Sequence, residues 1–322
     1  MPVQVLKETM GTYYRISFTG DNLTGLKDQI DSLLVALNEE VSTYIPTSTI
    51  SRFNYGDLPE LDAVALQQAP HFYQNVRLSW KIATLTQQYF NPTVMPLVNY
   101  WGFGYTEKRP VTTVDSAKID SILQFVGMEC IALDTVSHTL RKQHPSVQLD
   151  FSAIAKGYGV DLVADFLQNK GINNYLVDIG GEVVAKGNKG NSETPWRIGV
   201  AVPLETSAVT DYQIAVSLVD AAVATSGNYR NFYEAVGQKF SHTINPKTGF
   251  PERSNLLSTS ILAADCATAD ALATACMVAG LEKAYQMIDT LQGIEACFIY
   301  ADEQGQLQTR MTKGFEAIVV KE

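Results

Sequence analysis

Two polar residues stand in a segment of small and apolar residues at 269–274 (ADALAT). If this segment is helical, the spacing of four places the Asp270 carboxylate and the Thr274 hydroxyl on one face. Two hard oxygen donors at this spacing suit a cation that retains several waters, which is typical of Mg²⁺ rather than Zn²⁺. The alternative is structural, with an aspartate near a helix start and a threonine hydroxyl bonded to the preceding turn.

A lysine occupies an unusual position in the segment LDFSAIAKGYG at 149–159. The apolar spacing that follows predicts a helix with Ser152 as its N-cap. Lys156 then falls in the first turn, where the helix dipole disfavours a cation. A bound anion such as a phosphate would reverse this preference, and Gly157 would let it approach closely. The alternative is a helix start whose lysine extends into water.

One histidine lies beside a tight turn, in the segment SHTINPKTG at 241–249. The Asn-Pro and Thr-Gly pairs of this segment predict the turn. His242 at this place could act as a general base near neutral pH. The alternative is a histidine that is simply hydrogen-bonded at the end of a strand.

Aromatic residues in two loop-like segments could stack on a planar ring. They are Tyr44, within STYIP, and the pair Trp101 and Phe103, which flank Gly102. Aromatic residues at such positions also serve as ordinary core. No phosphate-binding P-loop is present, and the glycines near Lys156 lack the third glycine of a dinucleotide fingerprint. These segments alone therefore indicate a possible magnesium and phosphate site.

The apolar pattern around these residues predicts the elements that hold them. Strands are expected at 11–19, 131–133, 147–151, 174–187, 196–203, 213–227, 296–302 and 316–320. Helices are expected at 22–40, 63–89 and 266–291, with a loop at 42–54. Because helices and strands are interleaved without a regular β-α-β alternation, the sequence favours an α+β fold.

Composition excludes several classes of function. The chain has 24 Lys and Arg against 34 Asp and Glu, which argues against a nucleic-acid partner because such a protein needs a basic surface. Its four cysteines form no CxxC pair and its four histidines form no HExxH motif, so a zinc enzyme is not expected. The longest uncharged stretch, 82–106, contains prolines and amide side chains that do not suit a bilayer span.

Taken in order, the motifs resemble the ApbE family, the FAD:protein FMN transferases. The segments that carry the resemblance are MGTYYR at 10–15, STYIPTSTISRFN at 42–54, PLVNYWGFG at 96–104, LDFSAIAKGYGVD at 149–161, YLVDIGGEV at 175–183, ATSGNYRN at 224–231, SHTINPKTGFP at 241–251 and ADALATACMVAG at 269–280. Several long motifs in one order are far more specific than any single short pattern. Asn91 and Met95 depart from the family pattern, which often has Asp and Gly there.

The resemblance implies one α+β domain over 1–322, with mixed helices and mainly antiparallel strands. It also implies FAD as substrate, held in a cleft, with Mg²⁺ at its diphosphate. By motif position, the residues expected to line the FAD site are Met10, Tyr44, Trp101, Gly102, Phe103, Asp150, Lys156 and Ile244. Asp270 and Thr274 would bind Mg²⁺ through side chains, and Ala153 through its backbone carbonyl. His242 would be the general base.

The activity implied is magnesium-dependent transfer of the FMN half of FAD to a Thr or Ser hydroxyl of a target flavoprotein, with release of AMP. Two other activities are kept open at this point. One is an FAD diphosphatase, which uses the same metal site but lets water attack. The other is a non-catalytic FAD-binding lipoprotein, which would not need the pairing of Asp270 with Thr274 or His242.

The family also implies a location and partners. Most members are lipoproteins, so we expect the periplasmic face of the inner membrane, with a cytoplasmic location as the alternative. Residues 1–9 would then be the remnant of a truncated leader region. Contact with the membrane would occur only through a lipid anchor absent from this sequence. The expected acceptors are flavoprotein subunits of membrane redox complexes.

Overall fold

The computed structural model describes residues 3–20, 24–56, 58, 60–104, 113–190, 193–201, 212–228, 232–235 and 238–321. The chain divides into two compact units. The first consists of residues 1–34, 154–230 and 254–322, and the second of residues 35–153 and 231–253. The helix α1 (Leu26–Val41) continues from one unit into the other.

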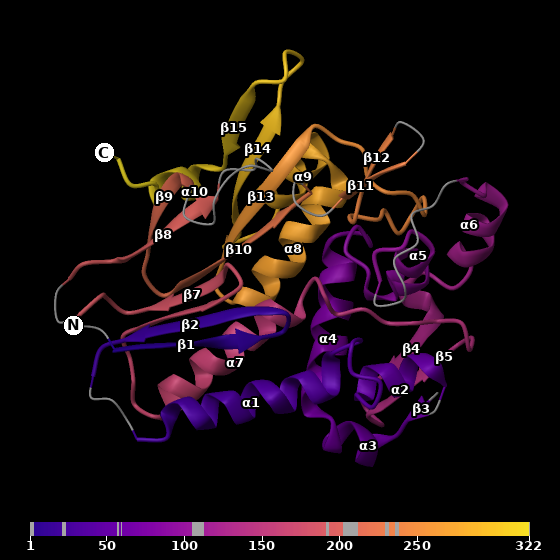
Figure 1. Cartoon of the computed structure of the whole chain (residues 1–322), viewed down its shortest axis with the longest axis horizontal. Helices are drawn as coiled ribbons and strands as arrows, with labels where there is room; N and C mark the ends of the chain where they lie inside the picture. The colour runs from indigo at the N-terminus through magenta and orange to yellow at the C-terminus, as the bar shows by residue number, and fades with distance from the viewer. Residues whose placement is uncertain are drawn as a thin grey trace. The chain divides into compact units, whose positions relative to one another are not determined.

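An antiparallel sheet forms the centre of the first unit. Its eight strands follow the order β1-β2-β6-β7-β10-β13-β14-β15 (Figure 1). Their bounds are β1 (Val3–Thr9), β2 (Thr12–Phe18), β6 (Tyr175–Ile179), β7 (Glu182–Lys186), β10 (Ala221–Gly227), β13 (Leu256–Ala263), β14 (Glu295–Ala301) and β15 (Leu307–Met311). Each neighbouring pair is antiparallel, and short hairpins connect β1 to β2, β6 to β7 and β14 to β15.

Both faces of this sheet are covered. The helices α7 (Ala155–Asn169) and α8 (Cys266–Ala279) pack against the sheet and against each other. Val183 and Val223 point away from these helices, into an apolar cluster with the ribbon β8 (Trp196–Ala201) and β9 (Tyr212–Leu218) and with α10 (Lys313–Ala317). Because strand residues alternate between faces, the neighbouring Glu182 and Ala222 lie on the helix side. The helix α9 (Leu281–Asp289) follows α8.

The second unit is mainly helical. Its helices are α2 (Thr49–Tyr55), α3 (Ala63–Gln68), α4 (Pro70–Leu85), α5 (Met95–Tyr100) and α6 (Ser116–Leu123), with 3₁₀ turns η1 (Pro92–Val94) and η2 (Met128–Cys130). A small sheet pairs β3 (Glu60–Leu61), β5 (Thr139–Lys142) and β4 (Ile131–Asp134), and a hairpin joins β11 (Phe232–Ala235) to β12 (Gln238–Ser241). The mixture of helices and antiparallel sheets confirms the predicted α+β class.

Residues 49–55 form α2, so the loop predicted over 42–54 is wrong in its second half. Ser48 caps this helix by accepting a hydrogen bond from the Ser51 N–H at 3.2 Å. Gly56 ends the helix with φ +93°, a left-handed conformation that favours glycine. The buried residues Ile50 and Phe53 are three apart, which is a helical spacing.

The strand predicted at 147–151 is wrong because side-chain bonds replace a strand partner. The amide group of Asn54 donates to the Leu149 carbonyl at 2.8 Å and accepts from the Leu149 N–H at 2.7 Å. This satisfies the backbone without a ladder. The strand predicted at 316–320 is also wrong, since α10 ends at Ala317 and Val319 forms only an isolated bridge with Val216. The sequence analysis also missed the strands β1, β3, β5, β11, β12, β13 and β15.

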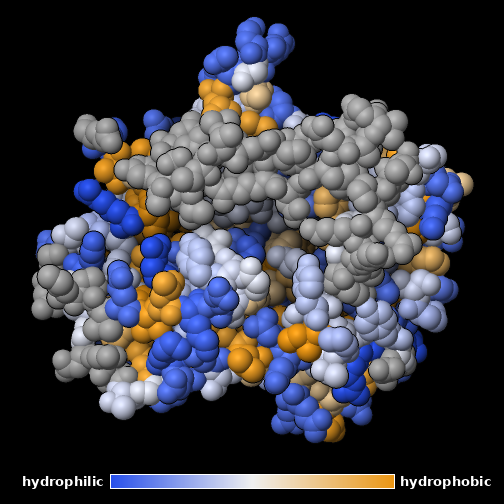
Figure 2. Space-filling model, viewed as in Figure 1, coloured by the Kyte–Doolittle hydropathy of each residue, from blue (hydrophilic) through white to orange (hydrophobic). Residues whose placement is uncertain are grey.

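In the part of the chain that the structure describes, no helix has both the length and the apolar character needed to cross a bilayer. Exposed apolar residues such as Leu6 and Val136 are scattered along the chain. On the face shown in Figure 2, hydrophobic and hydrophilic residues are interspersed wherever the residues are coloured.

Candidate functional site

Lys156 is the second residue of α7, as the sequence predicts. The predicted N-cap is wrong. The N-cap residue of α7 is Ile154, whose side chain makes no capping hydrogen bond. Ser152 lies too early in the chain, and its N–H and hydroxyl both donate to the Asp150 carboxylate at 2.8 and 2.5 Å. The N–H groups at the start of α7 are therefore not capped by a serine.

Asp270 belongs to α8 but meets the first turn of α7. Its Oδ2 accepts a hydrogen bond from the Gly157 N–H at 3.0 Å. Gly157 makes this approach possible, because a Cβ there would lie 2.8 Å from the Ala267 Cα and would overlap the Cys266 carbonyl. The sequence suggested that this glycine admits a ligand. The structure shows that it admits a neighbouring helix, and the approach of a ligand stays a prediction.

Lys156 forms an ion pair with Glu182, the first residue of β7, at 2.5 Å. The side chain of Glu182 is 3% exposed and that of Lys156 is 31% exposed. Burial raises the pKa of Glu182 to about 7, since it outweighs the opposing effect of the Lys156 ammonium. Burial alone would lower the pKa of Lys156, but Glu182 and Asp270 together raise it above its ordinary value.

The three charged groups form an ionic cluster, defined here as Lys156, Glu182 and Asp270. The pKa of Asp270 is also raised by burial, against the opposing influences of Lys156 and of the Gly157 N–H. Burying several charges is costly unless they are paired and hydrogen-bonded. One oxygen of the cluster, Oε2 of Glu182, is buried and has no hydrogen-bond partner among the described residues. Oε2 of Glu182 can therefore still accept a hydrogen bond or contact a cation.

Thr274 lies one turn after Asp270 on the same face of α8, and its hydroxyl is 3.0 Å from the Ser226 hydroxyl on β10. Among the residues that the structure describes, the Thr274 hydroxyl contacts this strand and makes no bond back to the preceding turn, which was the alternative from sequence. Within the described residues, no group of three or more His, Cys, Asp or Glu is arranged to hold a metal ion. The pair Asp270 and Thr274 fits Mg²⁺, which uses few protein carboxylates and keeps several waters.

In the second unit, four of the predicted flavin-site residues are adjacent. Trp101 and Ile244 belong to one apolar cluster, against which Phe103 packs. Gly102, at φ +75°, follows the end of α5, with its N–H bonded to Asn99 O and the Phe103 N–H bonded to Val98 O. This is a Schellman ending, which requires a left-handed residue at that point and turns the chain so that Phe103 leaves the helix.

Trp101 is fully buried, and its indole Nε1–H donates to the Gly249 carbonyl at 2.7 Å. This bond ties α5 to the turn after β12. In that turn, Gly249 has φ +78° and its N–H donates to Asn245 O at 2.8 Å, as the Asn-Pro and Thr-Gly pairs predict. His242 directly follows β12, and its ring lies edge-on to Phe103 at 6.4 Å between centroids. The proposed base and an aromatic ring therefore lie side by side.

The remaining predicted site residues of the second unit are Tyr44, Asp150 and Ala153, and each lies in a different environment. Tyr44 lies between α1 and α2 and is 72% exposed, so it is not a core residue. Asp150 is held by Ser152 and by its own N–H, which donates to Pro92 O at 2.7 Å. Burial raises the pKa of this carboxyl. Ala153 lies just before Ile154, the residue that precedes α7.

Met10 lies in the first unit, at the turn between β1 and β2. Met10 and Gly11 have φ of +50° and +71°, and Thr9 pairs with Thr12, which describes a two-residue hairpin turn. A positive φ is unusual for methionine and marks a locally strained residue. A cavity of about 570 Å³ is lined by residues 8–13, including Met10.

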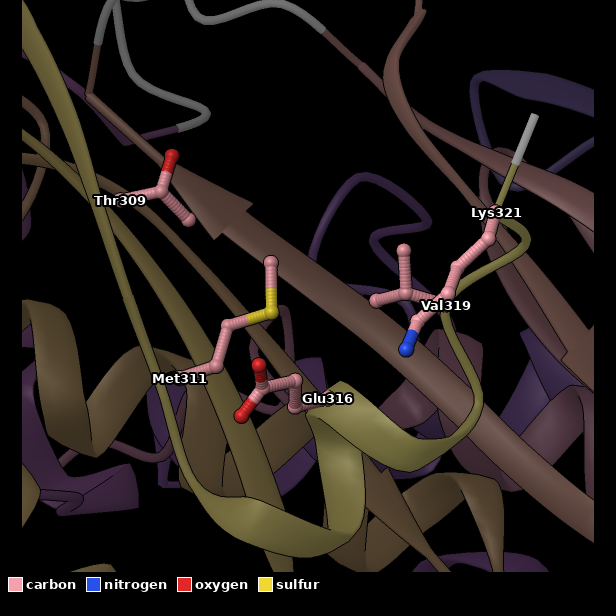
Figure 3. Close-up of a pocket in the computed structure, with 5 residues that line it drawn as sticks. All are labelled: Thr309, Met311, Glu316, Val319 and Lys321. Atoms are coloured by element: carbon pink, nitrogen blue, oxygen red, sulfur yellow. The ribbon is translucent and has the colours of Figure 1, made fainter.

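A second cavity, of about 370 Å³, lies in the first unit beside β15. Figure 3 shows the five residues that line it, which are Thr309, Met311, Glu316, Val319 and Lys321. None of them is among the predicted site residues. Sequence reasoning missed two others that do contact the predicted site: Glu182, which bonds to Lys156, and Ser226, which contacts Thr274. Glu182 stands in the motif DIGGE and Ser226 in the motif ATSG. A signal for them was a polar residue two positions from an apolar residue of the same strand, Val184 or Ala224, which places both on one face of the sheet.

The antiparallel sheet, the helices packed on it and the buried ionic cluster where α7 meets α8 define an α+β protein. The sequence model of the ApbE family matches residues 10–298, and the chain belongs to this family. It is 39% identical to the FAD:protein FMN transferase of Vibrio cholerae over 290 residues, which cover 88% of this chain and 83% of that protein.

Solved structures of the family have the same fold. The flavin transferase ApbE from Vibrio cholerae matches with a TM-score of 0.84 and 33% identity, covering 99% of both chains. The apo form of the flavinyl transferase ApbE from Pseudomonas stutzeri matches with a TM-score of 0.84 and 31% identity, covering 99% of this chain and 96% of that one. Both matches span the two compact units.

Proposed function

We propose that this protein is a flavin transferase that moves the FMN half of FAD onto a Thr or Ser hydroxyl of a target flavoprotein in a magnesium-dependent reaction. The observation that carries this proposal is the ionic cluster of Lys156, Glu182 and Asp270, one turn from Thr274 on α8, in a member of the ApbE family. A buried site with a lysine and an oxygen-rich helix face suits a phosphate ester and a hard cation.

The residues proposed to hold Mg²⁺ are the Asp270 carboxylate, the Thr274 hydroxyl and the Ala153 carbonyl. When bound, Mg²⁺ neutralises charge on the diphosphate and stabilises the departing phosphate of AMP. Lys156 supplies a second positive group at the start of α7, and the N-terminal end of a helix also favours an anion. Positioning and charge neutralisation are the main requirements of phosphoryl-type transfer.

Aromatic residues are proposed to bind the flavin half. Tyr44 and Phe103 offer rings that can stack on a flavin. Trp101, which is fully buried, would act by holding Gly102, Phe103 and the turn that follows His242. Met10, Asp150 and Ile244 complete the set expected from the family.

We assign His242 as the general base. The acceptor oxygen forms a bond to the phosphorus of the FMN half, the bond from that phosphorus to the AMP oxygen breaks, and AMP leaves. The hydroxyl proton passes to the His242 ring, because imidazole is a common general base near neutral pH. The redox-complex targets and the place at the periplasmic face of the inner membrane stay predictions drawn from the family.

Mass spectrometry tests the proposed function. Purified protein is incubated with FAD, MgCl₂ and a Thr-containing acceptor domain of a candidate redox subunit. We expect the acceptor to gain the mass of one FMN while AMP appears, and a chelator to stop both. Free FMN and AMP without a modified acceptor would indicate the diphosphatase activity instead. FAD that stays intact under every condition would favour the non-catalytic binding protein.

A further inference from the structure

One of the two carboxylate oxygens of Glu182 takes no part in the ion pair with Lys156. Its Oε1 contacts the Lys156 ammonium at 2.5 Å, whereas Oε2 is buried without a partner among the described residues. The whole residue is only 2% exposed. A buried carboxylate oxygen without a hydrogen-bond donor lowers the stability of the folded protein, because it loses its hydration and gains no bond in return. Its presence on the helix-facing side of β7 therefore calls for a functional reason.

Lys156 interacts with two carboxylates but is bonded to one. The charges of both Glu182 and Asp270 act on its ammonium. Among the described residues, however, its ion pair is with Glu182. Asp270 instead accepts a hydrogen bond from the Gly157 backbone. The lysine is thus held by β7, and the carboxylate of α8 is not taken up by an ammonium.

We propose that Glu182 is a positioning residue, which holds Lys156 so that the Asp270 carboxylate stays available to Mg²⁺. This inference rests on the proposed function. An ammonium and a metal ion compete for the same carboxylate, and at short range inside a protein their attraction to it is strong. Without the Glu182 charge, Lys156 would turn to Asp270 as its remaining acidic partner. The second oxygen of Glu182 can also accept a hydrogen bond from a water in the site.

Titration calorimetry of the full chain with MgCl₂ tests the role of Glu182. We expect Glu182→Gln to bind Mg²⁺ about tenfold more weakly, because its amide no longer competes for the ammonium as a charged acceptor does. Adding Lys156→Met to that variant should restore the affinity to within about threefold of the parent, since the competing ammonium is gone. A crystal structure of Glu182→Gln should show Lys156 Nζ paired with Asp270.

Three further variants make the result decisive. Asp178→Asn is the control, because it removes another buried carboxylate from the same β6–β7 hairpin. The Asp178 carboxylate is bonded to Arg15, Tyr13 and Gly181, so this variant should bind Mg²⁺ like the parent. Glu182→Asp keeps the charge on a shorter side chain and should show an intermediate affinity. It replaces Glu182→Gln if the latter does not fold, as judged by circular dichroism. Asp270→Asn should lose Mg²⁺ binding.

The outcomes separate the inference from the proposed function. Parental Mg²⁺ affinity in Glu182→Gln would overturn the positioning role. So would a double variant that stays as weak as Glu182→Gln, because Glu182 would then act directly on the metal. Parental affinity in Asp270→Asn would instead overturn the proposed metal site. A loss in Asp270→Asn with an unchanged Glu182→Gln would leave the proposed site intact and refute the inference alone.

Discussion

At the scale of single residues, the candidate site contains a carboxylate, an ammonium and an imidazole, each held by specific neighbouring groups. Asp270 is buried and accepts a backbone N–H, Lys156 is paired, and His242 lies beside an aromatic ring. Each environment restricts what the group can do. The carboxylate and the lysine suit charge neutralisation, whereas an imidazole at a strand end suits proton transfer.

Replacing His242 by alanine tests its assignment as the general base. We expect transfer of FMN to fall by about 10²–10⁴-fold at neutral pH, which is the usual effect of removing such a group. FAD binding, followed by flavin fluorescence, should change little. His144→Ala serves as the control, because this histidine of the same unit stacks on Phe125 at 4.3 Å and has no part in the proposed site. Near-parental transfer by His242→Ala would refute the assignment.

At the scale of elements, the contact between α7 and α8 decides the geometry of the ionic cluster. Gly157 faces the Cys266 carbonyl, and Asp161, one turn later, accepts the Cys266 and Ala267 N–H groups at 2.8 Å each. One helix thereby caps the other, which satisfies N–H groups that a helix start leaves free. The two helices are therefore fixed in register as well as in distance.

Gly157→Ala tests this close approach. Alanine is favoured over glycine inside a helix by about 1 kcal/mol, so local propensity alone predicts a more stable protein. We expect the opposite, a loss of about 1–3 kcal/mol, because the added methyl group overlaps the start of α8. Thermal unfolding measures the difference, with the exposed Gln168→Ala on the same helix as the control. A raised melting temperature in Gly157→Ala would show that the helices have room to separate.

At the scale of the whole molecule, buried carboxyls make folding depend on pH. Burial raises the pKa of Asp161 to about 7, although its two bonds to N–H groups oppose the shift. The native state therefore binds more protons than the unfolded state between about pH 4 and pH 7. In that range stability falls as the pH rises, and above about pH 7 this contribution levels off.

Asp161→Asn should make the pH dependence of stability flatter. Asparagine carries no titrating group, so the fall in melting temperature between about pH 5 and pH 7 should be smaller than in the parent. The variant should also be less stable than the parent at pH 8, where the charged Asp161 accepts both N–H groups and asparagine offers only one acceptor oxygen. Asp289→Asn, at the exposed end of α9, is the control. An unchanged slope would mean that Asp161 is charged throughout this range.

Much of this organisation could be predicted from the sequence alone. The spacing of four between Asp270 and Thr274 determined that they share a helix face, and the turn pairs after His242 determined a tight turn there. Ordered motifs determined the family, to which the chain belongs. These features depend on residues near one another in the chain, whose geometry follows from helix and turn periodicity.

Only the tertiary structure decided the partners of those residues. Lys156 pairs with Glu182 from a strand 26 residues later, and Thr274 contacts Ser226 from another strand. Residues 147–151 alternate like a strand, yet their backbone bonds to the side chain of Asn54, far earlier in the chain. Such contacts depend on which strands become neighbours and which face each residue presents. Packing of the whole sheet and its helices sets both, and local periodicity does not encode that choice.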